Sequence, residues 1–544
     1  MVAFNLADLA EHTADLLPDR TALIYGDRQL TFGELDARAN RVAHHLAAQG
    51  IERDDHVAIY AYNSLEYVEA MLGAYKLRAV PINVNYRYVE DELAYLFDNA
   101  DVVAAVFQAE FAPRIAAVAG RLPKLRHLVQ VGDGAPPSET GAVDYEQVLA
   151  EESPERDFGP RDDGDRYILY TGGTTGLPKG VVWRHEDVWR TLGGGIDFVT
   201  GVRVEDEWEL ARAAADTEPS MGLVLAPLMH GAAQWATLGG LFKGVTNVIL
   251  PRFDPHLVWD AVQRYRIAVV TITGDAMARP LIDALNESRY DTSALVAISS
   301  TAAVFSPVLK DQLFELLPNV VISEAVGSSE GGFNGMRLVE KGSSREPASG
   351  GGLINVPLGP DSTVIGDDDR PVAPGQVGRL ARGGNVPVGY YKDPEKTAVT
   401  FIEVSGRRHA VPGDFARLEL DGTMTLLGRG SQCINTGGEK VYPEEVESAL
   451  KAHPKVFDAL VLGVDDARWG QAVAAVVEPR PGEVPTLTEL AEHCRTRLAG
   501  YKVPRRLDLV ERMPRQPSGK PDYRRARGVM SQPATPAKNA KEPA

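Results

Sequence analysis

The chain has 544 residues, more than one hydrophobic core can hold, so we expect at least two domains. Hydrophobic residues make up 44% and charged residues 24%, as in soluble globular proteins, and the net charge of −18 argues against a nucleic acid or an anionic membrane as partner. The only two cysteines, Cys433 and Cys494, exclude a disulfide framework and a cysteine metal site, and indicate a reducing cytoplasm.

Helix and strand patterns alternate through the first third of the chain. Thr31 and Glu34 form a capping box that begins an amphipathic helix, which ends before Gly50. Further along, the pattern predicts a helix over 67–75 and buried strands over four apolar runs, 56–60, 79–84, 102–107 and 127–131. Runs at 267–272 and 320–322 continue it. Such alternation predicts an α/β fold with parallel sheets covered by helices on both faces.

One segment, 219–242, has no charged residue and is long enough to cross a bilayer. It contains prolines and glycines and lacks an aromatic or basic belt at its ends. We therefore expect a buried strand, turn and helix here rather than a membrane span.

A smaller α+β domain is predicted in the last ~110 residues. Pro443 opens a helix, the runs 459–464 and 472–477 predict strands, and Thr486 with Glu489 forms another capping box. The boundary is placed near 428–432, giving domains over 1–430 and 431–527. The remainder, 528–544, is rich in Pro, Ala and Lys, has no core-forming pattern and is predicted to be disordered.

The motif at 170–180 holds four glycines, three threonines and one lysine, directly after an apolar run. Glycine lets the backbone approach an anion, while hydroxyl and N–H groups donate to its oxygens and lysine adds positive charge. This composition favours a phosphate site over an ordinary flexible loop. It is not the P-loop of NTPases, since the required glycine falls on Pro178 and Gly180 follows Lys179.

Two interpretations compete for the motif at 326–332. The spacing Gly327-x-Ser329-x-Gly331 matches the nucleophile elbow of α/β-hydrolases, with Ser329 as nucleophile. Alternatively Glu330 holds Mg²⁺ beside a nucleotide, since a carboxylate with phosphate oxygens is the usual magnesium ligand set. A chain that already carries a phosphate loop favours the nucleotide.

Three later motifs are ambiguous when each is taken alone. Asp414 and Arg429 fit ordinary turns, and 437–443 fits the start of a helix at Pro443. Lys520, in the Pro/Gly-rich loop 514–521, fits a surface lysine.

Taken together and in this order, the motifs resemble those of the adenylate-forming superfamily, which comprises acyl-CoA synthetases, luciferases and peptide-synthetase adenylation domains. The resemblance extends from about Asp8 to Tyr523 and includes the stretch 389–397. Stretches 174–187 and 274–280 are similar to actinobacterial fatty-acyl-CoA synthetases, some of which activate sterol side-chain acids. The resemblance implies a large N-terminal domain with αβαβα-type sheets and a small α+β C-terminal domain that rotates on a hinge at Gln432.

The resemblance also implies the site residues. The nucleotide site would comprise Thr171, Gly172, Gly173, Thr174, Thr175, Gly176, Lys179, Ala302, Val326, Gly327, Ser328, Ser329, Asp414 and Arg429. Lys520 and Glu330 would be catalytic, and Glu330 and Thr174 would hold Mg²⁺. The acyl pocket would include His230, Gly231, Trp235 and Thr301, and coenzyme A would pass Gly437, Gly438, Glu439 and Lys440.

Two features of the acyl region stay open at this stage. His230 could be a core histidine with no role in binding. Small residues such as Gly231 and Gly239 leave room for a long or bulky acyl group.

The resemblance implies two half-reactions. A carboxylate attacks the α-phosphate of Mg·ATP, giving acyl-adenylate and pyrophosphate, and coenzyme A then displaces AMP to give a thioester. An acyl-adenylate enzyme that serves a carrier protein, and a hydrolase that uses Ser329, remain the alternatives. The sequence leaves open the acid, peripheral contact with a membrane, and the oligomeric state, for which a homodimer is one option.

Three positions depart from the family pattern. Val326 stands where an aromatic residue is usual, so stacking on adenine is weaker or comes from elsewhere. Ser431-Gln432 replaces the usual Lys-Asp pair, and Pro412 replaces a threonine. None of these changes removes a charged catalytic group.

Overall fold

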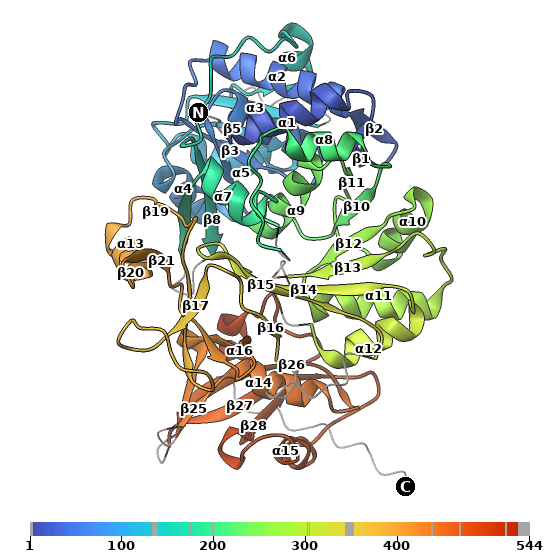
Figure 1. Cartoon of the computed structure of the whole chain (residues 1–544), viewed down its shortest axis with the longest axis vertical. Coiled ribbons are helices and arrows are strands. Elements are labelled where there is room, and N and C mark those ends of the chain that lie inside the picture. Colours follow the sequence, from blue (N-terminus) through green and yellow to red (C-terminus); the bar gives the residue numbers. More distant parts are fainter. Residues whose placement is uncertain are drawn as a thin grey trace.

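The computed structural model describes residues 4–132, 140–172, 177–197, 200–301, 303, 305–342, 353–436, 439–466, 469–516 and 519–530. Three sheets and their helices form a large N-terminal domain, and a fourth sheet forms a small C-terminal domain below it in the view of Figure 1. The mixed α/β architecture with unequal domains confirms the predicted fold class.

The first sheet has eight strands in the order β15-β14-β13-β12-β10-β11-β1-β2. Its strands are β1 (Thr21–Tyr25), β2 (Arg28–Thr31), β10 (Met221–Val224), β11 (Thr246–Val248), β12 (Val269–Ile272), β13 (Ala297–Ser300), β14 (Val321–Ser328) and β15 (Gly332–Val339). All neighbours are parallel except β1 with β2 and β14 with β15. The carboxyl ends of β10, β12, β13 and β14 therefore meet at one edge of the sheet.

The second sheet has eight strands in the order β19-β9-β8-β4-β3-β5-β6-β7. Its strands are β3 (His56–Tyr60), β4 (Val80–Asn83), β5 (Val102–Gln108), β6 (His127–Val131), β7 (Val143–Asp144), β8 (Arg166–Gly172), β9 (Pro178–Arg184) and β19 (Gly389–Tyr390). The four strands predicted from apolar runs in the first third are confirmed as β3 to β6. The pairs made by β9 are antiparallel and the others are parallel.

Helices pack between and around these two sheets. They are α1 (Leu6–Leu16), α2 (Phe32–Ala48), α3 (Leu65–Lys76), α4 (Glu90–Asn99), α5 (Ala112–Ala119), α6 (Tyr145–Glu151), α7 (His185–Leu192), α8 (Glu209–Ala215), α9 (Gly231–Phe242), α10 (Pro255–Tyr265), α11 (Asp275–Glu287) and α12 (Pro307–Leu316). Every residue of α3 is buried, so this helix lies inside the domain. The capping box of Thr31 and Glu34 is present at the start of α2, as predicted.

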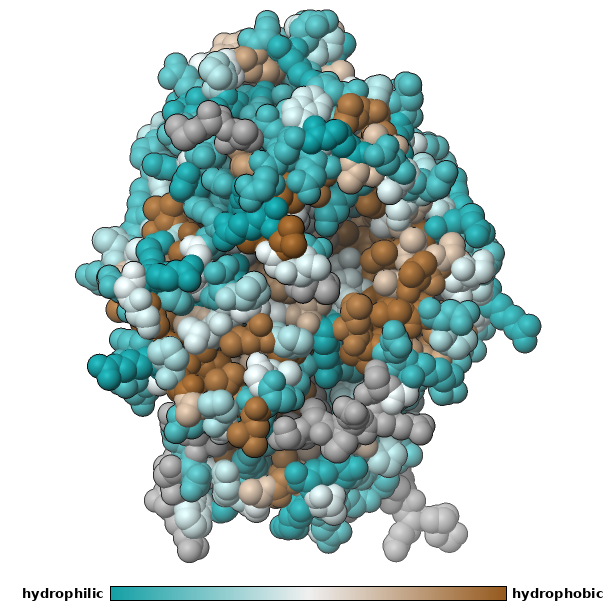
Figure 2. Space-filling model, viewed as in Figure 1, coloured by the Kyte–Doolittle hydropathy of each residue, from teal (hydrophilic) through white to brown (hydrophobic). Residues whose placement is uncertain are grey.

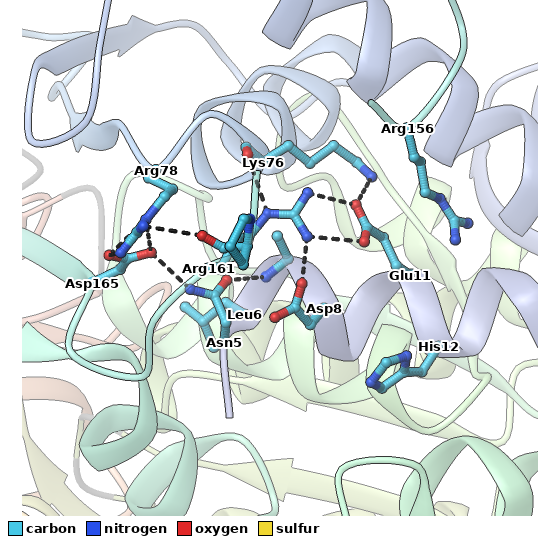
Figure 3. Close-up of polar contacts among 12 residues, drawn as sticks. Asn5, Leu6, Asp8, Glu11, His12, Lys76, Arg78, Arg156, Arg161 and Asp165 are labelled. Atoms are coloured by element: carbon cyan, nitrogen blue, oxygen red, sulfur yellow. Dashed lines mark hydrogen bonds and ion pairs between the residues drawn. The ribbon is translucent and has the colours of Figure 1, made fainter. Parts of the chain in front are cut away.

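The first helix is held by ion pairs rather than by apolar contacts alone (Figure 3). Arg161 bonds to both Asp8 and Glu11 of α1, and the Lys76 Nζ lies 2.5 Å from Glu11 Oε1. Asn5, which caps α1, donates to Asp165 Oδ2 at 3.0 Å. These contacts join the N-terminus to the strand pair that carries the glycine-rich motif.

A third, smaller sheet completes the large domain. Its strands are β16 (Asn355–Pro357), β17 (Ser362–Ile365), β18 (Val377–Arg382), β20 (Phe401–Val404), β21 (Arg407–Ala410), β22 (Asp414–Leu418) and β23 (Thr423–Arg429), with helix α13 (Pro394–Thr400) before β20. The antiparallel pair β22·β23 places Asp414 opposite Arg429. Two residues 15 positions apart in the chain are thus brought together by strand register.

The small domain is a five-stranded sheet with helices on both faces. Its elements are β24 (Ile434–Thr436), β25 (Glu439–Val441), α14 (Pro443–Lys451), β26 (Val456–Asp466), β27 (Gly470–Pro479), α15 (Leu487–Arg495), β28 (Arg506–Leu509) and α16 (Tyr523–Met530). The predicted helix at Pro443, the two strands and the second capping box are confirmed. Residues 528–530 are helical and Met530 is buried, which corrects the predicted start of the tail; residues 531–544 lie outside the described part.

The uncharged segment 219–242 folds as β10, a turn and α9, as expected. In the described part of the chain, no helix has the length and apolar character needed to cross a bilayer. Figure 2 shows apolar residues gathered at mid-height on the right of this face and again at its lower left, while its top is mostly hydrophilic.

Candidate active site

The predicted phosphate motif joins two antiparallel strands, β8 and β9. Thr171 pairs with Lys179 and Gly172 with Pro178, so the connection begins and ends at neighbouring positions. Gly173, Thr174, Thr175 and Gly176 lie outside the described residues. A loop closed by a strand pair differs from the strand-to-helix loop of P-loop proteins.

Lys179 is held by a residue that the sequence did not single out. Its Nζ lies 2.5 Å from Asp393 Oδ2, and both side chains are about one-third exposed. Asp393 also caps α13 by accepting the Lys396 N–H. The hydrogen bond from Lys179 lowers the pKa of Asp393, so this carboxylate is ionised. An incoming phosphate would compete with this carboxylate for Lys179.

Glu330 lies in the tight turn between β14 and β15. It is 8% exposed, and Tyr390 donates its hydroxyl to Glu330 Oε1 at 2.9 Å. Burial and the Glu330 carboxylate raise the pKa of Tyr390, so this hydroxyl keeps its proton and donates. Glu330 is thus oriented by a strand from the other large sheet.

The same turn argues against the hydrolase interpretation. A nucleophile elbow requires a strand, a sharp turn and a helix. Here Ser329 stands between two antiparallel strands, and the Ser329 carbonyl accepts the Trp183 indole N–H at 3.0 Å. Ser328 Oγ accepts the Gly331 N–H at 2.9 Å, which closes the turn. This geometry does not support Ser329 as a nucleophile.

Asp414 and Arg429 face each other across β22 and β23. The Arg429 Nε lies 3.2 Å from Asp414 Oδ1, and the guanidinium is 41% exposed, which leaves it open to a ligand. Loss of water around Arg429 opposes its charge, but the carboxylates of Asp414 and Glu330 outweigh that effect and raise the pKa of Arg429. The motif that holds Asp414 and Arg429 and the motif that holds Glu330 therefore interact electrostatically.

Lys520 extends from the small domain toward this group. Protein atoms surround its ammonium although solvent still reaches the side chain. Partial desolvation and the Arg429 cation lower the pKa of Lys520, while Glu330 and Asp414 act in the opposite direction. The small domain thus places its motif lysine within electrostatic range of three predicted nucleotide residues.

His230, a residue predicted for the acyl pocket, also lies within electrostatic range of Lys520. It caps α9, and burial, with the cations of Lys520 and Arg87, lowers its pKa to about 4. The His230 ring is therefore neutral at physiological pH. Within the described residues, its Nε2 is buried and has no hydrogen-bond partner. Buried polar atoms are normally hydrogen-bonded, so this nitrogen is a candidate for binding a ligand.

Asn83, at the end of β4, ties the two halves of the site together. Its Nδ2 donates to the Tyr170 carbonyl at 2.9 Å and to the Met229 carbonyl at 2.7 Å. The residue before His230 and the strand before the phosphate motif are therefore fixed to one side chain. In the sequence, the one feature that could have indicated Asn83 is its position near the end of a predicted strand.

The other residues predicted for the acyl pocket are Gly231, Trp235 and Thr301. A Cβ on Gly231 would lie 2.5 Å from Leu169 Cδ2, so its small size serves packing of α9 on β8. Trp235 is 5% exposed and packs edge-on against Tyr167 at 5.3 Å between ring centres. Thr301 follows β13 at the edge where the parallel strands end. Their contact with an acyl chain stays a prediction.

The other predicted residues lie outside the described part of the chain, in an apolar cluster or in the small domain. Ala302, Gly437 and Gly438 are outside the described residues. Val326 is 5% exposed within an apolar cluster of β14 and the third sheet, so its side chain is packed rather than presented to a base. Glu439 is exposed on β25, the edge strand of the small sheet that also carries Lys440, and Gln432 ends a short 3₁₀ helix, Gly430–Gln432.

Tyr390 and Asp393 are functional candidates without a role in the sequence analysis. Both belong to the stretch 389–397, whose resemblance was noted without a reason for it. The Tyr390 N–H donates to Thr397 Oγ1 at 2.9 Å, which explains the spacing of that stretch. Within this stretch, Tyr390 contacts Glu330 and Asp393 contacts Lys179.

The site thus combines a buried carboxylate, an Asp–Arg pair and a lysine from the small domain, a set of charges suited to a nucleotide. The comparisons with known proteins agree. A family model described as AMP-binding enzyme matches residues 10–391, and one described as AMP-binding enzyme C-terminal domain matches residues 445–520. The chain belongs to the AMP-binding enzyme family.

Curated relatives cover nearly the whole chain. A 3-oxocholest-4-en-26-oate–CoA ligase of Rhodococcus rhodochrous is 51% identical, over 97% of this chain and 96% of the relative. A medium/long-chain-fatty-acid–CoA/3-oxocholest-4-en-26-oate–CoA ligase of Mycobacterium tuberculosis is 52% identical over the same shares. The chain is an ATP-dependent acid–thiol ligase of the acyl-CoA synthetase class.

Solved structures show the same fold at lower identity. An anthranilate CoA ligase in complex with anthranoyl-AMP matches with a TM-score of 0.85 at 22% identity, covering 97% of this chain and 98% of the other. This likeness supports the architecture, and the site is argued from this chain's own residues.

Proposed function

We propose that this ligase activates a long-chain fatty acid or a bulky sterol side-chain acid, and that Lys520 brings the carboxylate and the α-phosphate together. The observation that supports this proposal is that Lys520 interacts electrostatically with four predicted site residues, Glu330, Asp414, Arg429 and His230. An ammonium at that point can bind an acyl carboxylate and an α-phosphate together. It stabilises charge that spreads over the phosphoryl centre.

The other residues divide the nucleotide among them. Asp414 accepts hydrogen bonds from ribose hydroxyls, and Arg429, oriented by Asp414, contacts ribose and phosphate. Lys179 exchanges its Asp393 partner for the departing phosphates. His230, neutral and unpartnered, lies beside the acyl carboxylate. The reacting groups are thereby held in one orientation, which supplies much of the rate enhancement.

Mg²⁺ would be held by Glu330 and, in the predicted loop, by Thr174. Within the described residues, no group of three or more His, Cys, Asp or Glu converges on one point. A single buried carboxylate suits Mg²⁺ that arrives with phosphate oxygens and water as its other ligands. When bound, the ion would neutralise phosphate charge during displacement.

The proposed substrate class is that of the curated relatives. Two ligases at about half identity over nearly the full chain act on 3-oxocholest-4-en-26-oate, and one of them also on medium- and long-chain fatty acids. We propose the same range here, in a cytoplasmic enzyme, as the low cysteine content indicates.

Thioester formation over a panel of acids tests this substrate range. The purified full chain, with Mg·ATP and coenzyme A, should form thioesters from long-chain fatty acids and a 3-oxo sterol side-chain acid, and much less from short acids. Product without ATP would instead indicate hydrolase-type chemistry. Adenylate without thioester would indicate an enzyme that serves a carrier protein.

Tyr390→Phe should weaken adenylation without removing it. The variant keeps the ring and loses the hydroxyl that orients Glu330, so we expect ATP–pyrophosphate exchange at limiting Mg·ATP to fall about tenfold. Excess Mg²⁺ should restore part of the loss. A matched control is Tyr391→Phe, which removes a hydroxyl bound to Asp101 instead. Equal losses in the two variants would contradict the role of Tyr390.

A further inference from the structure

Four charged side chains are linked in series from the large domain to the loop that carries Lys520. We call them the docking quartet. It consists of Asp275 at the start of α11, Lys451 at the end of α14, Asp458 in β26 and Arg515. The Lys451 Nζ lies 3.3 Å from Asp275 Oδ2 and 3.6 Å from Asp458 Oδ1. Arg515 donates its Nε and Nη2 to the two Asp458 oxygens at 2.6 and 2.7 Å.

The docking quartet is shielded from water and balanced in charge. Asp275 and Lys451 are each 5% exposed, and Asp458 is 11% exposed. Burial raises the pKa of Asp458, but Lys451 and Arg515 outweigh it and lower that pKa to about 2. Within the quartet two carboxylates thus face two cations, and the buried Glu447 also interacts with Lys451 and Arg515. Buried pairs add little net stability, but removing one partner leaves a costly buried charge, so they penalise other arrangements.

The quartet is connected directly to the backbone beside Lys520. Arg515 donates its Nη1 to the Gly519 carbonyl at 2.9 Å. Gly519 has φ +78°, and a Cβ there would lie 3.0 Å from the Ala276 Cβ. The Lys520 loop therefore presses on the first turn of α11, next to Asp275, and glycine is required by both conformation and space.

Asp275 is itself fixed within the large domain. Its Oδ1 accepts the Ser306 N–H at 2.7 Å, which leaves Oδ2 for Lys451. One turn further along α11, the Arg279 guanidinium lies 4.4 Å from the Phe457 ring centre of the small domain. The ionic and cation–π contacts together define one orientation of the small domain on α11.

We infer that the docking quartet positions Lys520 for adenylation, and that the Asp275–Lys451 contact must open before the small domain turns for the thioester step. The inference rests on the proposed role of Lys520. The four residues act through the orientation of the small domain, so they are positioning residues. Asp458 and Arg515 stay together within the small domain when it turns, whereas Asp275 stays behind.

The test is Asp275→Asn, which preserves side-chain volume and the acceptor for the Ser306 N–H but removes the charge facing Lys451. We expect ATP–pyrophosphate exchange to fall about tenfold, in the usual range for coupling between sites. Thioester formation from synthetic acyl-adenylate and coenzyme A should stay near wild type. Lys451→Gln, which removes the other partner, should give the same split between half-reactions.

Glu445→Gln is the matched control. Glu445 lies on the same helix as Lys451 and is 13% exposed, but its partner, Lys502 at 2.6 Å, belongs to the small domain. This variant should leave both half-reactions near wild type. Hydrogen–deuterium exchange of the ligand-free full chain gives a readout independent of activity. The first turn of α11 and the peptide holding Arg515 and Lys520 should exchange faster in Asp275→Asn and not in Glu445→Gln.

The outcomes separate this inference from the proposed function. Equal loss of both half-reactions in Asp275→Asn, or unchanged rates and unchanged deuterium uptake, would overturn the positioning role. A wild-type chain that forms no adenylate from any acid would overturn the proposed function instead. In that case deuterium uptake alone decides whether Asp275 docks the small domain.

Discussion

Lys520→Ala should abolish most of the adenylation half-reaction while the thioester half-reaction survives. The variant removes the cation that the small domain contributes within electrostatic range of Glu330, Asp414 and Arg429. Loss of one preorganised charge at a developing transition state costs about 10²- to 10³-fold in rate. ATP–pyrophosphate exchange measures the first step, and thioester formation from synthetic acyl-adenylate measures the second.

The control for this prediction is Lys455→Ala. Lys455 is another lysine of the small domain, and its Nζ lies 2.8 Å from Glu489 at the surface. It should leave exchange within about twofold of wild type, since exposed pairs contribute little. Exchange in Lys520→Ala as fast as in this control would rule out the role assigned to Lys520.

Gln432→Pro should give the opposite pattern, with adenylation retained and thioester formation from acyl-adenylate reduced by about 10²-fold. Gln432 ends the 3₁₀ helix between the domains, and the φ range of 3₁₀ helices, about −50° to −70°, includes the value that proline imposes. Proline is therefore compatible with the present orientation. It resists the change of backbone angle that a turn of the small domain requires.

Gln432→Ala separates backbone rigidity from loss of the side chain. Alanine removes the amide but leaves φ free, so both half-reactions should remain close to wild type. If both half-reactions fell equally in Gln432→Pro, the variant would be reporting damaged folding. If neither fell, the rotation would occur at another residue.

Local signals in the sequence were sufficient for most elements. The capping box of Thr31 and Glu34 is confirmed because it depends on residues three apart. The buried strands of the first third are confirmed because parallel strands covered on both faces are apolar throughout. Val326 shows the limit of such signals, since its burial depends on the third sheet, which packs on β14 from far along the chain.

Pairings between distant residues could not be read in this way. Lys179 and Asp393 are 214 residues apart, and Tyr390 and Glu330 are 60 apart. No periodicity reports which two side chains meet when separate sheets close on each other. Each residue stood in a motif, but its partner was unknown until the sheets were placed.

The sequence by itself determined the family, the α/β class and the charged residues available for adenylation, because these depend on residue types and short spacings. Only the tertiary structure decided which of them act together. It replaced the hydrolase interpretation of Ser329 by a β-turn, joined Asp414 to Arg429 by register, and brought Lys520 within electrostatic range of both. It also linked Lys520 to Asp275 through buried charges, whose desolvation makes their pairing specific to one orientation of the domains.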